Sequence, residues 1–137
     1  MNRILVDTNI VIDLLAKRAN FYAEAAELFS LSDKNKIKLS ISSLTFANTN
    51  YILSKLKSAR EAREILRKFR VLVEIVTLDD KIIDLALGND EFSDFEDGLQ
   101  YYSALENSVN LILTRNKKDF KNSKVPVLTA KEYLSTL

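Results

Sequence analysis

Three aspartates stand next to predicted strands or at the start of a predicted helix in this chain. Asp7 follows the run 4–6, Asp97 falls in the first turn of a predicted helix, and Asp119 lies shortly past the run 111–113. Unpaired carboxylates that come close together repel one another and raise each other's pKa unless a cation neutralises them. Their oxygens suit a hard divalent ion such as Mg²⁺, which orients or acidifies water for attack on a phosphodiester.

Each of these aspartates also has an ordinary structural interpretation. Aspartate commonly ends strands, and an acid in the first turn of a helix interacts favourably with the helix dipole. Asp94 shortly precedes Asp97 and can cap the same helix, while Asp13 is expected to point to solvent from its own helix. The chemical interpretation therefore requires a fold that brings the acids together.

The composition narrows the chemistry that is available. The 137 residues include 0 histidines and 0 cysteines, which excludes serine–histidine triads, histidine or thiolate metal sites, catalytic thiols and disulfides. Apolar residues make up 47% and charged residues 28%, as in an ordinary globular domain. No apolar run has the length of a membrane span, so we expect a cytoplasmic protein with no membrane partner.

The net charge of +1 conceals a segregation of charge along the chain. The segments 55–70 and 115–124 are basic, and the segment 79–106 between them is acidic. An acidic centre flanked by basic segments suits a metal site beside a polyanion, and solvated helix faces produce the same pattern.

Strand and helix signals alternate along the chain. Apolar or alternating runs predict strands at 3–6, 37–42, 74–78 and 111–114, with an edge strand containing Pro126 at 125–129. Helical periodicity predicts helices at 9–17, from Phe21 onward, at 44–56, 58–72 and 79–88, within 93–110, and at 129–137. This alternation predicts a single α/β domain over residues 1–137, a three-layer α/β/α sandwich with a mostly parallel sheet of four to five strands.

Capping residues and apolar faces refine these helices. Thr8 or Asn9 can cap the first helix, and Asn20 can cap the second. In the helix within 93–110, the apolar spacing places Leu105 on the buried side. Because ligands of open parallel sheets bind at the carboxyl ends of the strands, Asp7 is expected to emerge at the functional edge.

Four segments together are more specific than any single acid. They are ILVDTNIVIDLL (4–15), LSISSLTFANTNYIL (39–53), FEDGLQYYSAL (95–105) and LILTRNKKDF (111–120). In this order they closely resemble the PIN-domain family, particularly its single-domain bacterial members akin to VapC-type toxins. The resemblance implies an endoribonuclease that depends on Mg²⁺ or Mn²⁺, with Asp7, Asp97 and Asp119 as the metal-binding and catalytic acids.

Two positions depart from the family pattern. Asn48 stands where many members carry a glutamate, and Asn116 stands where many carry an aspartate. Each asparagine can still offer a carbonyl oxygen, but a less negative site should bind the ion more weakly. Glu96, beside Asp97, is expected to assist catalysis and, with Asp94, to compensate for the lost charge.

Other polar residues near these acids are candidates for supporting roles. Asn9 and Thr114 can hydrogen-bond a carboxylate and fix its orientation, or can act as caps. Arg115, Lys117 and Lys118 can bind RNA phosphates, and are equally typical of a solvated loop.

The resemblance implies that this protein hydrolyses RNA as the toxin of a toxin–antitoxin pair, with a small antitoxin partner and a homodimer as common features of such proteins. A PIN-like domain that has lost catalysis and binds RNA or protein is the alternative, because both asparagines reduce the charge of the site. A phosphoacceptor receiver domain also begins with a strand that ends in aspartate, but no glycine-rich or proline-containing loop follows Asp79 and Asp80.

Overall fold

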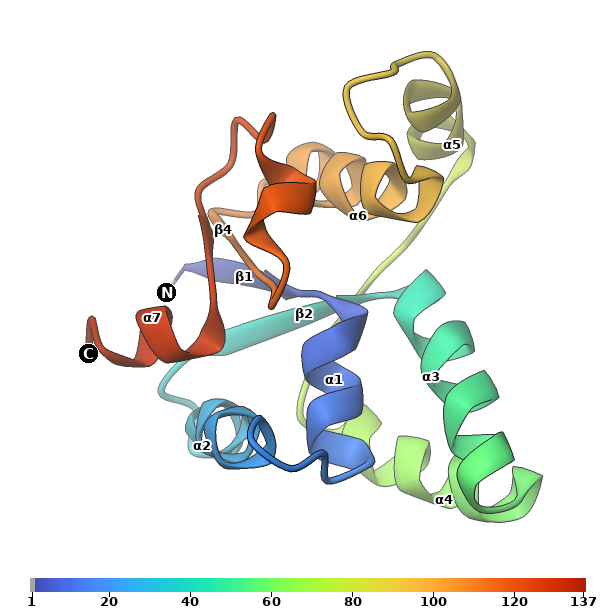
Figure 1. The fold of residues 1–137 in the computed structure, drawn as a ribbon, viewed down its shortest axis with the longest axis vertical. Coiled ribbons are helices and arrows are strands. Elements are labelled where there is room, and N and C mark those ends of the chain that lie inside the picture. The colour runs from blue at the N-terminus through green and yellow to red at the C-terminus, as the bar shows by residue number, and fades with distance from the viewer. Residues whose placement is uncertain (1) are drawn as a thin grey trace.

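A five-stranded parallel sheet lies at the centre of the computed structural model, which describes residues 2–137 (Figure 1). Its strands are β1 (Arg3–Val6), β2 (Lys38–Ser42), β3 (Glu74–Val76), β4 (Leu111–Leu113) and β5 (Val127–Leu128). The order across the sheet is β3-β2-β1-β4-β5, and each neighbouring pair is parallel. The predicted α/β/α architecture is confirmed, and β5 lies at an edge, where Pro126 before it is tolerated.

Helices cover both faces of this sheet. They are α1 (Thr8–Leu15), α2 (Tyr22–Asp33), α3 (Ser43–Leu56), α4 (Ala59–Arg70), α5 (Asp80–Leu87), α6 (Phe95–Glu106), α7 (Ala130–Leu134) and the 3-10 helix η1 (Lys117–Phe120). Figure 1 shows α5 and α6 on one face, and α1, α2, α4 and α7 on the other. Within residues 2–137, every helix is too short or too polar to cross a membrane.

Successive side chains of β1 point to opposite faces of the sheet, and the apolar interior consists of two cores, one on each face. Ile4 and Val6 pack with α1, α2, α4 and α7, whereas Leu5 packs with α5 and α6 on the opposite face. All three side chains are at most 1% exposed. β1 is therefore buried on both faces, as central strands of parallel sheets are, and a carboxylate at its end must emerge beside the helices.

The chain turns directly from strand to helix at the carboxyl edge of the sheet. Asp7 is the single residue between β1 and α1, and Ser42 is both the last residue of β2 and the N-cap of α3. The amino ends of both helices are thereby fixed at the carboxyl edge. In Figure 1, α6 also begins on this side of the molecule, near α3.

The structure corrects two predicted helix starts. Asp7, rather than Thr8 or Asn9, caps α1, and its side chain accepts a hydrogen bond from the Thr8 amide. Asn20 does not cap α2, because its φ of 74° places it in a left-handed turn before the helix. Phe21 stands at the cap position without a side-chain hydrogen bond. The carboxylate predicted for chemistry thus also satisfies the backbone where β1 becomes α1.

A further correction concerns α6. Leu105, expected on the buried side, is 40% exposed, because the buried residues of this helix run without a break from Gly98 to Ala104. The middle turns of α6 are therefore buried and its carboxyl end is exposed to solvent, which is why helical spacing alone wrongly predicted that Leu105 would be buried.

The cap of α3 offers a test of how firmly this helix is anchored at the carboxyl edge. The Ser42 hydroxyl accepts a hydrogen bond from the Thr45 amide at 3.3 Å inside the protein. Ser42→Ala should lower the free energy of unfolding by about 1 kcal/mol in a urea titration. The neighbouring exposed Ser43→Ala is the control and should change it by less than about 0.5 kcal/mol. Equal effects would contradict the capping role.

Candidate active site

Asp7 is held by donors from two elements at the carboxyl edge. Its Oδ1 accepts from the Thr8 amide at 2.8 Å, and its Oδ2 accepts from the Thr114 hydroxyl at 2.8 Å and from Asn9 Nδ2 at 3.4 Å. Asn9 Nδ2 also lies 3.3 Å from Thr114 Oγ1. These bonds join the start of α1 to the residue that follows β4, so the carboxylate is fixed in one orientation.

The surroundings of Asp7 act on its pKa in opposite directions. Burial, with only 8% of the residue exposed, raises the pKa above its usual value. The bonds from Thr114 and from the Thr8 amide lower it, while the charges of Asp119 and Glu96 raise it again. The net shift is upward, so the ionised form of Asp7 is held at a cost in free energy that a nearby cation would offset.

Asp97 has the most perturbed carboxyl in this site. Burial, followed by the charges of Asp7, Asp94, Asp119 and Glu96, raises its pKa to about 7. These effects mean that the four other acids all lie within electrostatic reach of Asp97, although they come from three separate parts of the chain. The fold therefore brings together Asp7, Asp97, Asp119 and Glu96, the acids that the sequence singled out.

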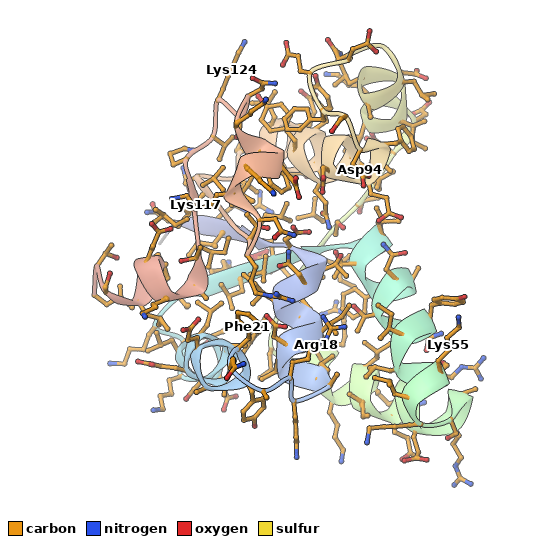
Figure 2. All side chains as sticks on the ribbon, in the orientation of Figure 1. Arg18, Phe21, Lys55, Asp94, Lys117 and Lys124 are labelled. Carbon is orange, nitrogen blue, oxygen red and sulfur yellow. The ribbon has the colours of Figure 1, made fainter. Side chains whose placement is uncertain are left out.

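Glu96 and Asp94 occupy different positions at the start of α6. Glu96 is exposed, and its Oε2 accepts a hydrogen bond from Asn48 Nδ2 at 3.3 Å, which links α6 to α3 across the site. Asp94 caps α6 by accepting from the Glu96 amide at 2.8 Å. Figure 2 shows Asp94 at the end of α6 that lies nearer to α3. Asn48 thus stands within the acidic site, in contact with one of its carboxylates.

The segment after β4 supplies the remaining site residues. Thr114 is fully buried, and its hydroxyl oxygen accepts a hydrogen bond from the Asn116 amide at 3.1 Å. Asp119 lies in η1 and lines a polar cleft of about 470 Å³ together with Lys118 and Lys121. The charge of Asp119 contributes to the raised pKa values of Asp7 and Asp97, so the segment after β4 lies beside both acids.

A divalent ion suits this set of donors. Within residues 2–137, no three acidic side chains already stand in the arrangement of a metal site. The available ligands are carboxylate and amide oxygens, the type that Mg²⁺ and Mn²⁺ prefer, and Mg²⁺ needs only one or two protein carboxylates because it retains several waters. Beside its burial, the charges of four neighbouring acids raise the pKa of Asp97, and a cation at this site would oppose that effect. The residues present therefore fit such an ion.

A buried polar network that the sequence reasoning missed lies beneath the acids. The Thr45 hydroxyl accepts from Gln100 Nε2 at 2.8 Å and lies 2.9 Å from the Thr8 hydroxyl. Gln100 Nε2 also reaches Thr8 Oγ1 at 3.4 Å. These contacts tie α1, α3 and α6 together, the helices that begin at the site. The spacing along the sequence could have indicated this network, because Gln100 lies one helical turn after Asp97 on the same side of a predicted helix.

Two of the three cations predicted to bind phosphates are engaged within the protein. Arg115 Nε lies 2.8 Å from Asp13 Oδ2, and its guanidinium stacks over the Phe21 ring at 4.1 Å. Asp13 is only 1% exposed, so the expectation that it points to solvent is wrong. Lys117 Nζ lies 3.1 Å from Glu132, whereas Lys118 is exposed beside Asp119. Arg115 is thus committed to α1, and its backbone amide donates to Asn9 beside Asp7 at 3.3 Å.

These two ion pairs make a matched test. Arg115→Met leaves the buried Asp13 carboxylate without its counter-charge and should lower the free energy of unfolding by about 3 kcal/mol. Lys117→Met breaks a pair whose side chains are 44% and 45% exposed, and should change it by less than about 1 kcal/mol. Urea titrations at neutral pH measure both. A smaller loss for Arg115→Met than for Lys117→Met would contradict a structural role for Arg115.

The pH dependence of stability tests the electrostatic coupling of Asp97. An acid whose pKa is higher in the folded chain than in the unfolded chain destabilises the fold once it ionises. In metal-free protein, Asp97 should therefore lower the free energy of unfolding as pH rises from 3.8, the usual pKa of an aspartate, to about 7, with no further loss above that range.

The measurement compares urea titrations of wild type and Asp97→Asn across this pH range in the presence of chelator. The stability of Asp97→Asn relative to wild type should rise with pH, since the variant carries no ionising group at this position. Asp33→Asn, at the exposed end of α2, is the control and should show no such trend. A constant difference between Asp97→Asn and wild type would contradict the coupling.

The sequence and the fold of this chain are similar to those of known proteins. The chain is 30% identical over 135 residues to Ribonuclease VapC1 of Aquifex aeolicus, covering 96% of this chain and 92% of that protein. DNA-bound VapBC from Salmonella typhimurium has a similar fold, with a TM-score of 0.70, 18% identity and coverage of 95% of this chain and 99% of that one.

VapC20 of Mycobacterium tuberculosis, a toxin that cleaves the sarcin-ricin loop, has a similar fold too. Its TM-score is 0.64 at 16% identity, with coverage of 80% of this chain and 86% of that one. The family profile of the PIN domain matches residues 3–118, a range that contains Asp7, Asp97 and the whole β1–β4 framework. The chain therefore belongs to the PIN-domain family.

Proposed function

We propose that this protein is an endoribonuclease that hydrolyses RNA phosphodiester bonds with the help of Mg²⁺ or Mn²⁺. The observation that carries the proposal is the convergence of four acids on Asp97, whose pKa rises to about 7. The name of the Aquifex aeolicus relative, a ribonuclease, and the description of VapC20 as a toxin that cleaves the sarcin-ricin loop support RNA as the substrate. Membership of the PIN-domain family removes the receiver-domain alternative.

Each acid has a distinct part in the proposed reaction. Asp7, Asp97 and Asp119 would hold the ion through carboxylate oxygens, a role for which Asp97 would have to be deprotonated. When bound, the ion supplies positive charge beside the scissile phosphate and makes water there more acidic. Glu96, exposed beside Asn48, accepts a proton from the attacking water.

The bonding changes define the products. The water oxygen forms a bond to phosphorus, and the bond from phosphorus to the 3′ oxygen on the opposite side breaks. The 3′ oxygen takes up a proton from solvent, while Glu96 releases to solvent the proton that it accepted. The products are a 5′-phosphate and a 3′-hydroxyl. The chain's own donors to Asp7, from Thr114 and the Thr8 amide, keep this carboxylate aligned throughout.

Asn48 and Asn116 lower the negative charge of the proposed site and leave its aspartates in place. Asn48 donates to Glu96, so it replaces the repulsion expected from a glutamate at this position with a hydrogen bond. The backbone amide of residue 116 donates to the Thr114 hydroxyl that holds Asp7, a contact that does not depend on the side chain at this position. The lower negative charge predicts weaker binding of the ion.

We further propose that the protein is a toxin that forms a complex with a small antitoxin. The similarity of its fold to VapBC from Salmonella typhimurium supports such a partner. A cationic or hydrogen-bonding segment of the antitoxin that covers the acidic site would block both the ion and the substrate.

The test is end-mapped cleavage of total cellular RNA by purified protein. Wild type with Mn²⁺ should produce discrete new 5′-phosphate ends, and chelator should abolish them. Asp7→Asn and Asp97→Asn should each lose at least about 100-fold in rate, as expected for the loss of charges that act in the transition state. Asp33→Asn, remote from the site, is the control for the effect of removing one acid.

Two results would contradict the proposal. Cleavage that persists in chelator or in Asp97→Asn would place the reaction elsewhere or assign it to a contaminant. Absence of cleavage by folded wild type in the presence of Mn²⁺ would favour the alternative that this PIN domain binds RNA or protein without hydrolysis.

A further inference from the structure

The outer face of α3 continues from the acidic site to the basic part of the molecule. Asn48 contacts Glu96, and Tyr51 and Lys55 follow it at helical spacings of three and seven residues, which places all three on one side of the helix. Figure 2 shows Lys55 projecting outward from α3, on the side of the molecule where Asp94 marks the start of α6. This face is therefore contiguous with the mouth of the proposed active site.

Tyr51 is the most exposed aromatic residue near the site, ahead of Phe95 at the start of α6, which is 46% exposed. Tyr51 is 61% exposed, whereas Tyr101 and Tyr102 are 2% and 6% exposed. Phe46, on the same helix, packs against Phe69 at a ring distance of 5.9 Å. Packing in the protein core thus accounts for the rings of Tyr101, Tyr102 and Phe46 but leaves the Tyr51 ring largely in contact with water.

Lys55 holds the Tyr51 ring and carries a charge of its own. Its Nζ lies 4.3 Å from the ring centroid, a cation–π contact that restrains both side chains on the helix surface. Lys55 lies over one face of the ring, and with Tyr51 61% exposed, ring surface remains accessible to another planar group.

The charge around this ring favours a polyanion. Lys57 at the end of α3 and the arginines of α4 are exposed, and α4 packs directly against α3. An exposed aromatic ring together with lysine and arginine side chains is the combination that binds single-stranded nucleic acid, in which bases stack and phosphates pair with cations.

We propose that Tyr51 and Lys55 form a binding platform for single-stranded RNA, on which a base stacks against the accessible surface of the Tyr51 ring and Lys55 contacts a neighbouring phosphate. The platform rests on the proposed function, because it lies one helical turn from Asn48 and directs the strand into the acidic site. It selects unpaired RNA, since a base within a duplex has no free face for the tyrosine.

The test measures the affinity for a short labelled single-stranded RNA in the Asp97→Asn background, where the RNA is bound without being cut. Tyr51→Ala should weaken binding by about 5-fold or more, the usual effect of removing a stacking ring. Tyr51→Phe retains the ring and should stay within about 2-fold of the parent. Tyr22→Ala, which removes an exposed tyrosine from α2, is the matched control and should leave the affinity unchanged.

The contribution of Lys55 is read from the salt dependence of the same binding. Lys55→Ala should reduce the slope of log Kd against log salt by about 0.7, the value for one phosphate contact on a single strand. Lys34→Ala, an exposed lysine after α2, should leave the slope unchanged. An unlabelled duplex of the same sequence should compete poorly.

Cleavage assays on Tyr51 variants that retain Asp97 test the platform and the nuclease separately. A nuclease whose KM and RNA affinity do not change in Tyr51→Ala would overturn the platform and leave the proposed function standing. Binding of RNA that depends on the Tyr51 ring, without cleavage by wild type, would support the platform and contradict the nuclease. Equal losses in Tyr51→Ala and Tyr51→Phe, or no RNA binding by folded protein, would overturn the platform.

Discussion

The buried carboxyl group of Asp7, at the end of a strand that is buried on both faces, is the constraint on which the site depends. At 8% exposure it needs donors from the protein, and it obtains them from the Thr8 amide, Thr114 and Asn9. The same carboxylate caps α1 and accepts a hydrogen bond from Thr114, the residue after β4. The direction of the first helix, the pairing of β1 with β4 and the position of the first acid are therefore set by one group of hydrogen bonds.

Around Asp7 the fold gathers like charges that it does not neutralise. Burial raises the pKa values of Asp7 and Asp97, and the charges of the neighbouring acids raise them further. Neutral contacts hold the elements in place: the Thr8, Thr45 and Gln100 side chains bind α1, α3 and α6 together, and Asn48 bridges to Glu96. Acidic side chains that are held close together by neutral hydrogen bonds are suited to bind a cation. The repulsion that lowers the stability of the metal-free fold is the same repulsion that a bound cation would relieve.

Much of the fold followed from the sequence because it depends on local pattern. The alternation of strands and helices predicted the parallel sheet, and strand ends predicted where Asp7 and Thr114 would meet, since parallel strands end at one edge. The contacts that the sequence reasoning missed join distant segments. The ion pair between Asp13 and Arg115 and the hydrogen bond between Thr45 and Gln100 join residues that come together only in the folded chain. Helical spacing likewise could not distinguish the exposed Tyr51 from the buried Tyr101.

The central claim is that Asp7 and Asp97 together create a site for a divalent ion, and calorimetric titration of Mn²⁺ into wild type and into each Asp→Asn variant at neutral pH tests it most directly. The account predicts binding to wild type with release of protons, because Asp97 has a pKa of about 7 before the ion binds. It also predicts an affinity at least about 10-fold weaker in both variants. Equal affinity in Asp7→Asn and wild type, or binding without proton release, would contradict it.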